Sequence, residues 1–316
     1  MTRVASIDCG TNSIRLLVAD VPAAGAHTDL LRRMEVVRLG EGVDATGRLA
    51  PQAIERTRRV LAEYAAAARD LGATAVRMVA TSATRDAANR GDFEDMVVAT
   101  LGQKPDVVSG REEAELSFLG ATASLDAAAT AHGSPPPRPP FLVVDIGGGS
   151  TEFVLGDGSG VRAAHSVDIG CVRLTERHLR GDPPTAEEIR RAEADIRSAL
   201  DQVRAEVPVD QAVSLVGLAG SVTTVAALAL ALPAYDADAI HGSRIAVDDV
   251  RAVTADLLAA TRARRAAMPV MHPGRVDVIG AGSLILRVLM DEFAAAEVVV
   301  SEHDILDGIA LRLARG

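Results

Sequence analysis

The feature that most restricts the fold of this chain is a short pattern that occurs twice. DCGTNSIRLLV begins at Asp8, and DIGGGSTEFVL begins at Asp145. In both stretches a glycine follows the aspartate by two positions, a serine follows it by five, and an apolar run comes next. One glycine-rich turn is weak evidence, but the same turn in both halves of a chain indicates an internal repeat. The sequence therefore predicts two related halves, each opening with a strand–turn–strand unit.

Stretches typical of strands and of helices alternate along both halves. The expected strands are residues 3–8, 14–21, 75–80, 107–108, 212–218 and 297–300, with a strand–turn–strand unit over 141–155. The expected helices are residues 51–71, 93–101, 112–123, 185–206, 222–232, 247–261, 280–293 and 305–315. This alternation predicts an α/β fold, and 316 residues suffice for two domains. The stretch AHGSPPPRPP, residues 131–140, is interpreted as a surface loop or linker just after the first domain.

Charge and cysteine content exclude some classes of function. The net charge of −10 argues against a general binder of nucleic acid or of an anionic membrane, but it allows an anionic substrate in a locally basic cleft. Cys9 and Cys171 lack metal or redox spacing, which fits a reducing cytoplasm, and the first residues contain no apolar run of signal-peptide length. The uncharged stretch 211–235 is long enough to span a bilayer. Because glycine, serine and threonine lie at its centre, we interpret it as a buried strand, a turn of small residues and a helix.

Small residues in the two turns suit the binding of phosphate. In such a turn, backbone N–H groups can approach an anion closely, and the hydroxyls of Ser13, Ser150 and Thr151 add donors. The leading aspartates, Asp8 and Asp145, repel an anion unless a Mg²⁺ ion lies between them and the phosphate, usually through water. The pattern therefore predicts phosphate and a divalent cation at the same place.

The two halves differ seven positions after the aspartate. The first half has Arg15 there, which can hold phosphate, and the second has Glu152, which can hold a metal or orient a water. Each turn alone would also serve as an ordinary hairpin turn, but the repetition favours phosphate binding. The first loop comprises Asp8, Gly10, Asn12, Ser13 and Arg15, and the second comprises Asp145, Gly147, Gly148, Gly149, Ser150 and Thr151.

Together with other motifs, these loops resemble the exopolyphosphatase and guanosine pentaphosphate phosphohydrolase family (Ppx/GppA), within the actin, sugar-kinase and heat-shock ATPase superfamily. The matching stretches are DCGTNSIRLL, ATSATRDAAN, SGREEAELSFLG, DIGGGSTEFVLG, DIGCVRLTE, GLAGSVTT and SEHDILDGIA. The resemblance covers nearly the whole chain and is to the short members with two domains. It implies two actin-like (ribonuclease H-like) domains with a cleft between them: residues 1–127, with the helix 302–316 packed back on them, and residues 128–301. It also implies a cytoplasmic homodimer.

The resemblance implies a catalytic centre built from carboxylates. It places the general base at Glu113, with Glu112 as the alternative if the alignment is one residue off; both could instead belong to a solvated helix face. It implies that Asp145 and Glu152 also take part in catalysis. The expected ligands of Mg²⁺ or Mn²⁺ are Asp8, Asp145 and Glu152.

Further residues are expected to contact the substrate. The resemblance favours Arg85 and Arg173 as phosphate contacts, with Asn89 as a weaker candidate, whereas an exposed helix start is the alternative for Arg85. Gly220 and Ser221 could bind phosphate at a helix N-terminus or could only allow a strand and a helix to pack closely. The expected phosphate-binding residues are Asn12, Ser13, Arg15, Arg85, Gly147, Gly148, Gly149, Ser150, Thr151, Arg173, Gly220 and Ser221.

These expectations point to an exopolyphosphatase that uses Mg²⁺ to release terminal orthophosphate from inorganic polyphosphate. The alternative enzyme removes the terminal phosphate of guanosine pentaphosphate, which presents a similar anhydride end. A protein of another class would bind guanosine tetra- or pentaphosphate or a nucleotide and signal without hydrolysis, but the set of carboxylates argues against it. A kinase is compatible with the fold and would need ATP and an acceptor site. Neither nucleic acid nor a membrane is an expected partner.

Overall fold

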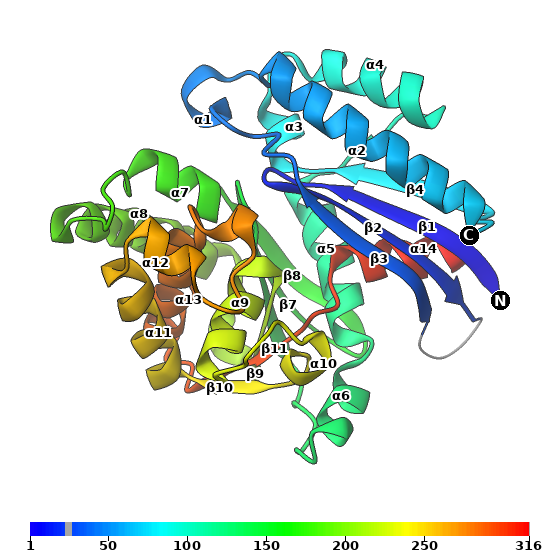
Figure 1. The fold of residues 1–316 in the computed structure, drawn as a ribbon. Coiled ribbons are helices and arrows are strands. Elements are labelled where there is room, and N and C mark those ends of the chain that lie inside the picture. Colours follow the sequence, from blue (N-terminus) through cyan, green and yellow to red (C-terminus); the bar gives the residue numbers. More distant parts are fainter. Residues whose placement is uncertain (23–26, 316) are drawn as a thin grey trace. The chain divides into compact units, whose positions relative to one another are not determined.

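The computed structural model describes residues 1–22 and 27–315 (Figure 1). The chain divides into two compact units: unit 1 comprises Met1–Ala123 and Asp304–Gly316, and unit 2 comprises Ser124–His303. The expected boundaries, 127/128 and 301/302, lie within a few residues of these. The proline-rich stretch belongs to unit 2, because the Arg138 N–H donates to Ser214 Oγ (3.0 Å) and the Pro140 carbonyl accepts from the Val213 N–H (2.8 Å). The stretch is therefore a mostly exposed loop within unit 2, which agrees with the surface-loop interpretation and not with the alternative of a linker.

Unit 1 is built on a five-stranded sheet in the order β3-β2-β1-β4-β5, in which β1, β2 and β3 are antiparallel and β4 and β5 run parallel to β1. Its strands are β1 (Thr2–Cys9), β2 (Ser13–Val21), β3 (Thr28–Val36), β4 (Ala75–Ala80) and β5 (Asp106–Val107). Its helices are α1 (Val43–Thr46), α2 (Pro51–Asp70), α3 (Ser82–Asp86), α4 (Arg90–Leu101), α5 (Gly110–Thr122) and α14 (Ile305–Arg315).

The two faces of the unit 1 sheet are covered by different helices. Figure 1 shows α2 and α4 on one face and the C-terminal helix α14, in red, on the other. Ile7 belongs to the apolar cluster that includes α2, whereas Val4 and Leu17 belong to the cluster that includes α14. Because side chains alternate along a strand, Asp8 and Arg15 share the face of Val4 and Leu17. The candidate residues of the first loop therefore lie on the α14 side of the sheet.

Unit 2 is built on a six-stranded sheet in the order β10-β11-β9-β6-β7-β8. Its strands are β6 (Phe141–Ile146), β7 (Thr151–Asp157), β8 (Gly160–Val167), β9 (Ser214–Leu218), β10 (Arg244–Ala246) and β11 (Glu297–Val300). Its helices are α6 (Leu125–Ala131), α7 (Cys171–Arg177), α8 (Ala186–Glu206), α9 (Ala219–Ala229), α10 (Ala237–Ile240), α11 (Val247–Ala259), α12 (Arg262–Ala266) and α13 (Ile279–Glu292). One apolar cluster joins this sheet to α8, α9, α11 and α13.

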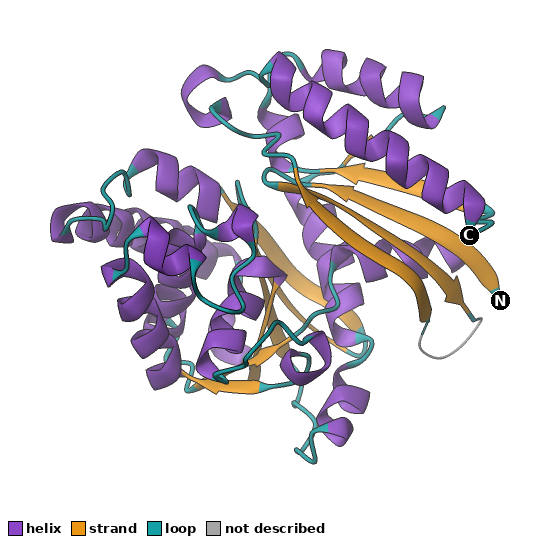
Figure 2. Cartoon of the chain, in the orientation of Figure 1, coloured by secondary structure: helices purple, strands orange, loops and turns teal. Residues whose placement is uncertain are grey.

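The internal repeat appears as the same arrangement of strands in both sheets. β1 lies between antiparallel β2 and parallel β4, and β6 lies between antiparallel β7 and parallel β9. A third antiparallel strand follows in each unit, β3 in the first and β8 in the second. Figure 2 shows strands and helices mixed in each unit. The predicted α/β class and the predicted hairpin at the start of each half are confirmed.

The uncharged stretch 211–235 forms a strand and a helix, as expected. β9 ends at Leu218 and α9 begins at Ala219, so the predicted turn of small residues is the first turn of the helix. None of the helices in the described part of the chain combines the length and the apolar character needed to cross a membrane.

A cluster of charges ties α14 to strand β3. The Asp307 side chain is fully buried and accepts from Arg32, and His27 Nε2 lies 2.9 Å from its Oδ1 and 3.1 Å from Asp29 Oδ1. The hydrogen bonds to Asp29 and Asp307 raise the pKa of His27 from 6.5 to about 9. His27, Asp29 and Asp307 have metal-ligand spacing, but Arg32 pairs with both carboxylates, so the charges of this cluster are already balanced.

The raised pKa of His27 predicts a stability that depends on pH. Protonated His27 stabilises the folded state, so its contribution is complete below pH 6.5 and is lost as the pH rises through about 9. We expect the difference in melting temperature between the wild type and His27→Gln to shrink over this range, as measured by circular dichroism. A difference that stays constant from pH 6.5 to above pH 9 would contradict the assignment.

Candidate active site

The turns of the two hairpins have the same local geometry. The Gly10 N–H donates to the Ser13 carbonyl at 3.0 Å, and the Gly147 N–H donates to the Ser150 carbonyl at 3.0 Å. The strand registers also agree, because Asp8 pairs with Arg15 across β1 and β2, as Asp145 pairs with Glu152 across β6 and β7. Cross-strand partners lie side by side on one face of a sheet. Each aspartate therefore faces the residue that differs between the two halves.

Both turns leave backbone donors unused. Within the described part of the chain, the N–H groups of Thr11 and Asn12 donate to no acceptor, and neither do those of Gly148, Gly149 and Ser150. Backbone amides of consecutive residues in a turn form concave sites for anions. The geometry of both turns therefore suits phosphate, as the sequence predicts.

The first turn is held in place from several sides. Thr11 Oγ1 and Ser82 Oγ share a hydrogen bond of 2.9 Å, and the Asn12 carbonyl accepts from the N–H groups of Val37 and Arg38. The side chains of Asn12 and Ser13 make no hydrogen bond to any residue that the structure describes. Their polar groups can therefore contact a ligand without a rearrangement of the turn.

Arg15 lies between two carboxylates. Its Nε and Nη2 donate to Asp8 Oδ2 at 3.0 and 2.6 Å, and its Nη1 donates to Asp304. Burial raises the pKa of the Asp8 carboxyl above its ordinary value, and Arg15 opposes that shift. This arrangement differs from the expected one, since a guanidinium bound to two carboxylates is neutralised and is poorly placed to bind phosphate as well.

Two carboxylates face each other at the second turn. Asp145 is 7% exposed and Glu152 is 1% exposed, and Ser166 Oγ donates to Glu152 Oε1 at 2.8 Å. Like charges directly opposite on paired strands destabilise a sheet, and burial makes the repulsion larger. A hard divalent cation with oxygen ligands, such as Mg²⁺, would relieve it. The predicted metal ligands of unit 2 therefore fit such an ion.

Asp8 fits a cation for a different reason. Its Oδ1 is buried and makes no hydrogen bond to any residue in the described ranges, although Oδ2 is bound by Arg15. A buried carboxylate oxygen without a partner is costly. Coordination of a cation, directly or through water, would satisfy it.

The glycine turn of unit 2 rests on the beginning of α7. The N–H groups of Cys171 and Val172 donate to the Gly147 and Gly148 carbonyls at 3.0 and 2.9 Å, and the Arg173 N–H donates to Gly148 at 3.2 Å. The backbone of Arg173 is therefore anchored directly beside the turn, and its expected contact with phosphate stays a prediction.

The beginning of α9 lies next to the same turn. A Cβ atom on Gly282 would lie 2.1 Å from Ser221 Oγ and 3.3 Å from Cys171 Cβ. Burial raises the pKa of the Cys171 thiol to about 11, although a hydrogen bond with Ser221 opposes the shift. Gly220 and Ser221 are therefore close to the α7 start that supports the glycine turn. This closeness is compatible with both interpretations, phosphate binding and close packing.

The close fit at Gly170 leads to a prediction. A Cβ atom at this position would lie 2.4 Å from the Gly148 carbonyl group and 2.6 Å from the Gly149 N. We expect Gly170→Ala to displace the glycine turn, to destabilise the protein by about 1–3 kcal/mol through overpacking and to weaken substrate binding. Thermal melts and the KM for phosphate release measure both effects. Gly158→Ala is the control, because nothing lies within 4 Å of a Cβ there; equal effects of the two variants would contradict the argument.

The structure distinguishes the two candidate general bases on α5. Glu113 is 8% exposed, and its Oε2 accepts from Arg85 Nη1 at 3.1 Å. The Glu112 side chain is 39% exposed and pairs with Arg77 at 3.2 Å. Burial and a cationic partner are common for catalytic carboxylates, whereas Glu112 resembles an ordinary surface charge. Arg85 lies beside Glu113 and also donates to the Val108 carbonyl at 3.1 Å.

Other residues have roles that the sequence alone did not indicate. Asn89, a candidate phosphate contact, instead holds the backbone of Leu49 through both its amide oxygen and its amide nitrogen (2.8 and 3.1 Å). Asp304 and Ser166 bind candidate site residues but were not predicted. Asp304 lies within the quoted stretch SEHDILDGIA, whereas no motif marks Ser166.

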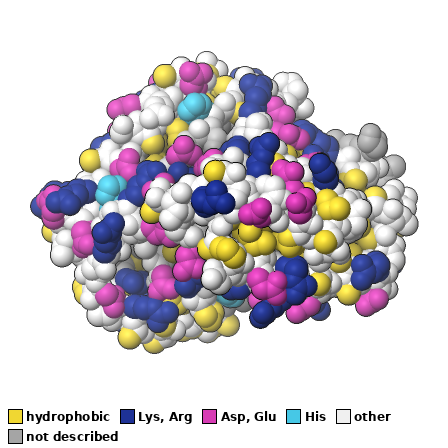
Figure 3. Space-filling model, turned by 90° about the horizontal axis from the view of Figure 1, so that it is seen from above, with side chains coloured by type: hydrophobic (Ala, Val, Ile, Leu, Met, Phe, Trp, Pro, Cys, Tyr) yellow, Lys and Arg dark blue, Asp and Glu magenta, His cyan; other side chains and the backbone are white. Residues whose placement is uncertain are grey.

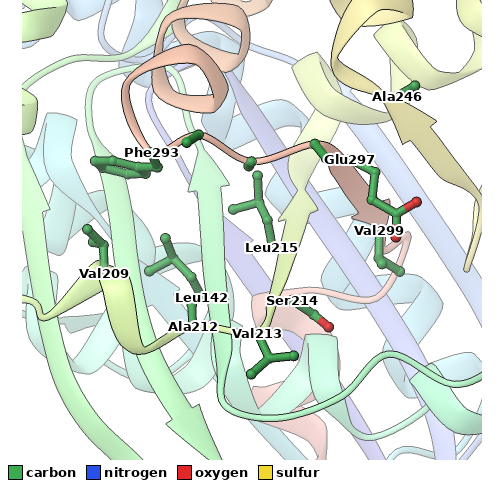
Figure 4. A pocket seen from close by; sticks show the side chains of 13 residues that line it. Leu142, Val209, Ala212, Val213, Ser214, Leu215, Ala246, Phe293, Glu297 and Val299 are labelled. Carbon is green, nitrogen blue, oxygen red and sulfur yellow. The ribbon is translucent and has the colours of Figure 1, made fainter.

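A cavity of about 420 Å³ lies elsewhere in unit 2 (Figure 4). It is lined by Leu142, Leu215, Phe293 and other mostly apolar residues around the first residues of β6, β9 and β11. The glycine turn, by contrast, follows the last residue of β6. No arginine or lysine lines this cavity, so it does not suit a chain of phosphates.

The surface carries charges of both signs. On the face seen in Figure 3, basic and acidic side chains are interspersed. Many arginines are engaged in ion pairs, such as Arg58 with Glu55 (2.7 Å) and Arg251 with Asp291 (2.6 Å). The positions of Arg173, beside the glycine turn, and of Arg85, beside Glu113, are therefore more informative than the overall number of arginines.

Three comparisons with known proteins agree with one another. Residues 17–315 match the model of the Ppx/GppA phosphatase family. The chain is 51% identical to Exopolyphosphatase 2 of Mycobacterium tuberculosis, over 99% of each chain. A crystal structure described as an exopolyphosphatase-like protein has a TM-score of 0.92 and 40% identity, over 99% of both chains. The PPX-GPPA enzyme of Aquifex aeolicus has a TM-score of 0.80 and 32% identity, over 98% of this chain and 99% of that one.

Proposed function

The chain belongs to the Ppx/GppA phosphatase family, and on this premise we propose that it is an exopolyphosphatase, a hydrolase that releases terminal orthophosphate from inorganic polyphosphate. The observation that carries the proposal is the pair of equivalent turns, each with unused backbone amides beside a buried aspartate. Such turns suit successive phosphates of a chain. The close similarity to Exopolyphosphatase 2 supports the same substrate.

The phosphates of the substrate are proposed to contact three groups of residues. The first is the turn of unit 1, with the polar side chains of Asn12 and Ser13. The second is the glycine turn of unit 2, together with Arg173 and the α9 start at Gly220 and Ser221. The third is Arg85, whose guanidinium would stabilise charge on the phosphoryl oxygens. We assign Arg15 to hold Asp8 rather than to bind phosphate, because it already binds two carboxylates.

Mg²⁺, or Mn²⁺ in its place, is proposed to bind to Asp8, Asp145 and Glu152. The buried and unpaired oxygen of Asp8 and the facing carboxylates of unit 2 support this set. When bound, the ion would neutralise negative charge on the transferring phosphoryl group. Within each unit, strand pairing sets the positions of these carboxylates.

Glu113 is proposed as the general base. It would accept a proton from the attacking water as the new bond to the terminal phosphorus forms and the bond to the bridging oxygen breaks. The shortened polyphosphate would leave as an anion stabilised by the backbone amides. Arg85, which donates to Glu113 Oε2, would keep the carboxylate oriented.

Guanosine pentaphosphate is the second candidate substrate, since its terminal phosphoanhydride could enter the same turns.

We further propose a cytoplasmic homodimer. The two cysteines, Cys9 and Cys171, are free and buried, which is compatible with a reducing compartment. Light scattering of the purified protein tests the dimer.

Phosphate release from short polyphosphate, long polyphosphate and guanosine pentaphosphate tests the proposed function. Each is measured with Mg²⁺, with Mn²⁺ and with a chelator. We expect release from polyphosphate that requires the metal, and the ratio of kcat/KM values identifies the preferred substrate. Binding of these ligands without release in the presence of Mg²⁺ would overturn the proposal and favour a regulatory protein.

A further inference from the structure

Three charged side chains, those of Asp8, Arg15 and Asp304, are linked by hydrogen bonds on the α14 side of unit 1. Arg15 donates to Asp8 through Nε and Nη2 and to Asp304 through Nη1. The side chains of Asp8 and Asp304 are only 5% and 9% exposed. Asp8 and Arg15 are cross-strand neighbours near the first turn, whereas Asp304 is close to the other end of the sequence. Two carboxylates thus share one guanidinium, and negative groups outnumber positive ones in this cluster of three side chains.

The binding of Arg15 to Asp8 is one-sided. Both hydrogen bonds reach Oδ2, while Oδ1 makes none within the described residues. A guanidinium free to move could bind both oxygens of a carboxylate, which is its preferred geometry. The bond between Nη1 and Asp304 restrains it. Arg15 therefore fixes the orientation of Asp8 but leaves one oxygen to another partner.

Asp304 is itself held firmly. Its Oδ1 accepts from the Leu306 N–H (2.9 Å), its carbonyl accepts from the Gly308 N–H (3.1 Å), and its own N–H donates to Asp307 Oδ2 (2.8 Å). A Cβ atom on Gly120 of α5 would lie 1.8 Å from the Asp304 carbonyl oxygen. The helix that carries the proposed general base thus packs directly against Asp304.

We propose that Asp304 is a positioning residue for the metal site: it holds Arg15 so that Asp8 presents a single free oxygen to the divalent cation. This inference rests on the proposed role of Asp8 as a metal ligand. Asp304 contacts Arg15 and not the cation, so it acts through another residue.

Metal binding without substrate tests the proposal. Free Mn²⁺ is measured by electron paramagnetic resonance during titration of the wild type and Asp304→Asn. Asparagine caps a helix as well as aspartate does, so α14 keeps its first turn. We expect Asp304→Asn to weaken Mn²⁺ binding by about 10- to 100-fold, the range found when a residue behind a metal ligand is replaced. Where Asp304→Asn does not melt cooperatively, Asp304→Ser, which retains a capping oxygen, replaces it.

The same pair of strands provides a matched control. Arg3 and Asp20 pair at the other end of β1 and β2, with hydrogen bonds of 2.8 and 2.9 Å. Asp20→Asn removes the same charge from the same ladder and should leave Mn²⁺ binding unchanged. Mn²⁺ binding by Asp304→Asn that equals the wild type would overturn the proposal, and so would a wild type that binds no Mn²⁺.

A double mutant separates action through Arg15 from direct action. In the Arg15→Gln background, Asp304→Asn should change Mn²⁺ binding little, because Arg15, through which Asp304 is proposed to act, is absent. If Asp304→Asn weakens Mn²⁺ binding as much in the Arg15→Gln background as in the wild type, Asp304 acts directly on the ion. This result would overturn the positioning role. Phosphate release by the same samples keeps the two proposals apart. One result would support this inference and overturn the proposed function: the wild type binds Mn²⁺ tightly, Asp304→Asn binds it more weakly, and neither sample releases phosphate.

Discussion

Replacing Glu113 by glutamine is expected to lower kcat for phosphate release by about 100- to 10,000-fold, the usual range for loss of a general base. Glutamine keeps the shape of the side chain and can still face Arg85, so the fold should survive. Without a carboxylate, the attacking water has no acceptor for its proton. Single-turnover release of phosphate at saturating Mg²⁺ measures the effect.

Glu112→Gln is the matched control for this prediction. Glu112 precedes Glu113 on the same helix, but its side chain is exposed and pairs with Arg77. We expect kcat to remain at the wild-type level, since exposed ion pairs contribute little. Loss of activity in Glu112→Gln with retention in Glu113→Gln would show that the alignment is one residue off, as the alternative interpretation of the sequence allowed.

Replacing Glu152 by glutamine is expected to change activity and stability in opposite directions. Without metal, the neutral side chain removes the repulsion between Glu152 and Asp145. The free energy of unfolding should then increase by up to about 1 kcal/mol, and the melting temperature should rise. With metal, one of the proposed ligands is missing, and phosphate release should fall at least about 100-fold. Thermal melts with a chelator and with Mg²⁺, together with release assays, measure both effects.

Asp157→Asn provides a contrast on the same strand. Asp157 ends β7, pairs with Arg162 and accepts from Ser159 at 2.8 Å. These partners lower the pKa of Asp157, with the hydrogen bonds to Ser159 as the main cause, so the charge stabilises the fold. We expect Asp157→Asn to lower the melting temperature and to leave phosphate release unchanged. A chelator-treated Glu152→Gln that melts below the wild type would mean that the facing carboxylates do not repel.

Much of the fold follows from the sequence because buried strands and amphipathic helices carry clear patterns. β4, β11 and α14 begin and end at the residues expected, and the repeated hairpins were found from their turns. Three strands were missed, β3, β8 and β10, all at edges of their sheets. β3, with the sequence TDLLRRMEV, is largely exposed and has charges on both faces. It becomes a strand because it pairs with β2, and this pairing leaves no trace in the local periodicity of a largely exposed segment.

The site was predictable where its residues are close together in sequence. The spacing from Asp8 to Arg15 and from Asp145 to Glu152 becomes direct cross-strand pairing. Contacts between distant segments could not be predicted, and these decide the role of Arg15. Its bond to Asp304 joins a hairpin at the start of the chain to the cap of the final helix, and no spacing rule connects the two.

The position of α14 affects how the chain can fold during its synthesis. Strands β1 and β2 are made before unit 2, yet Val4 and Leu17 are covered by Leu306 of a helix that is made after all of unit 2. Domains generally fold as units as they emerge, so unit 2 can complete its core while one face of the first sheet is still bare. The sheet that emerges first is completed last. The surroundings of Asp8 are thus complete only when α14 packs on this face and Asp304 binds Arg15.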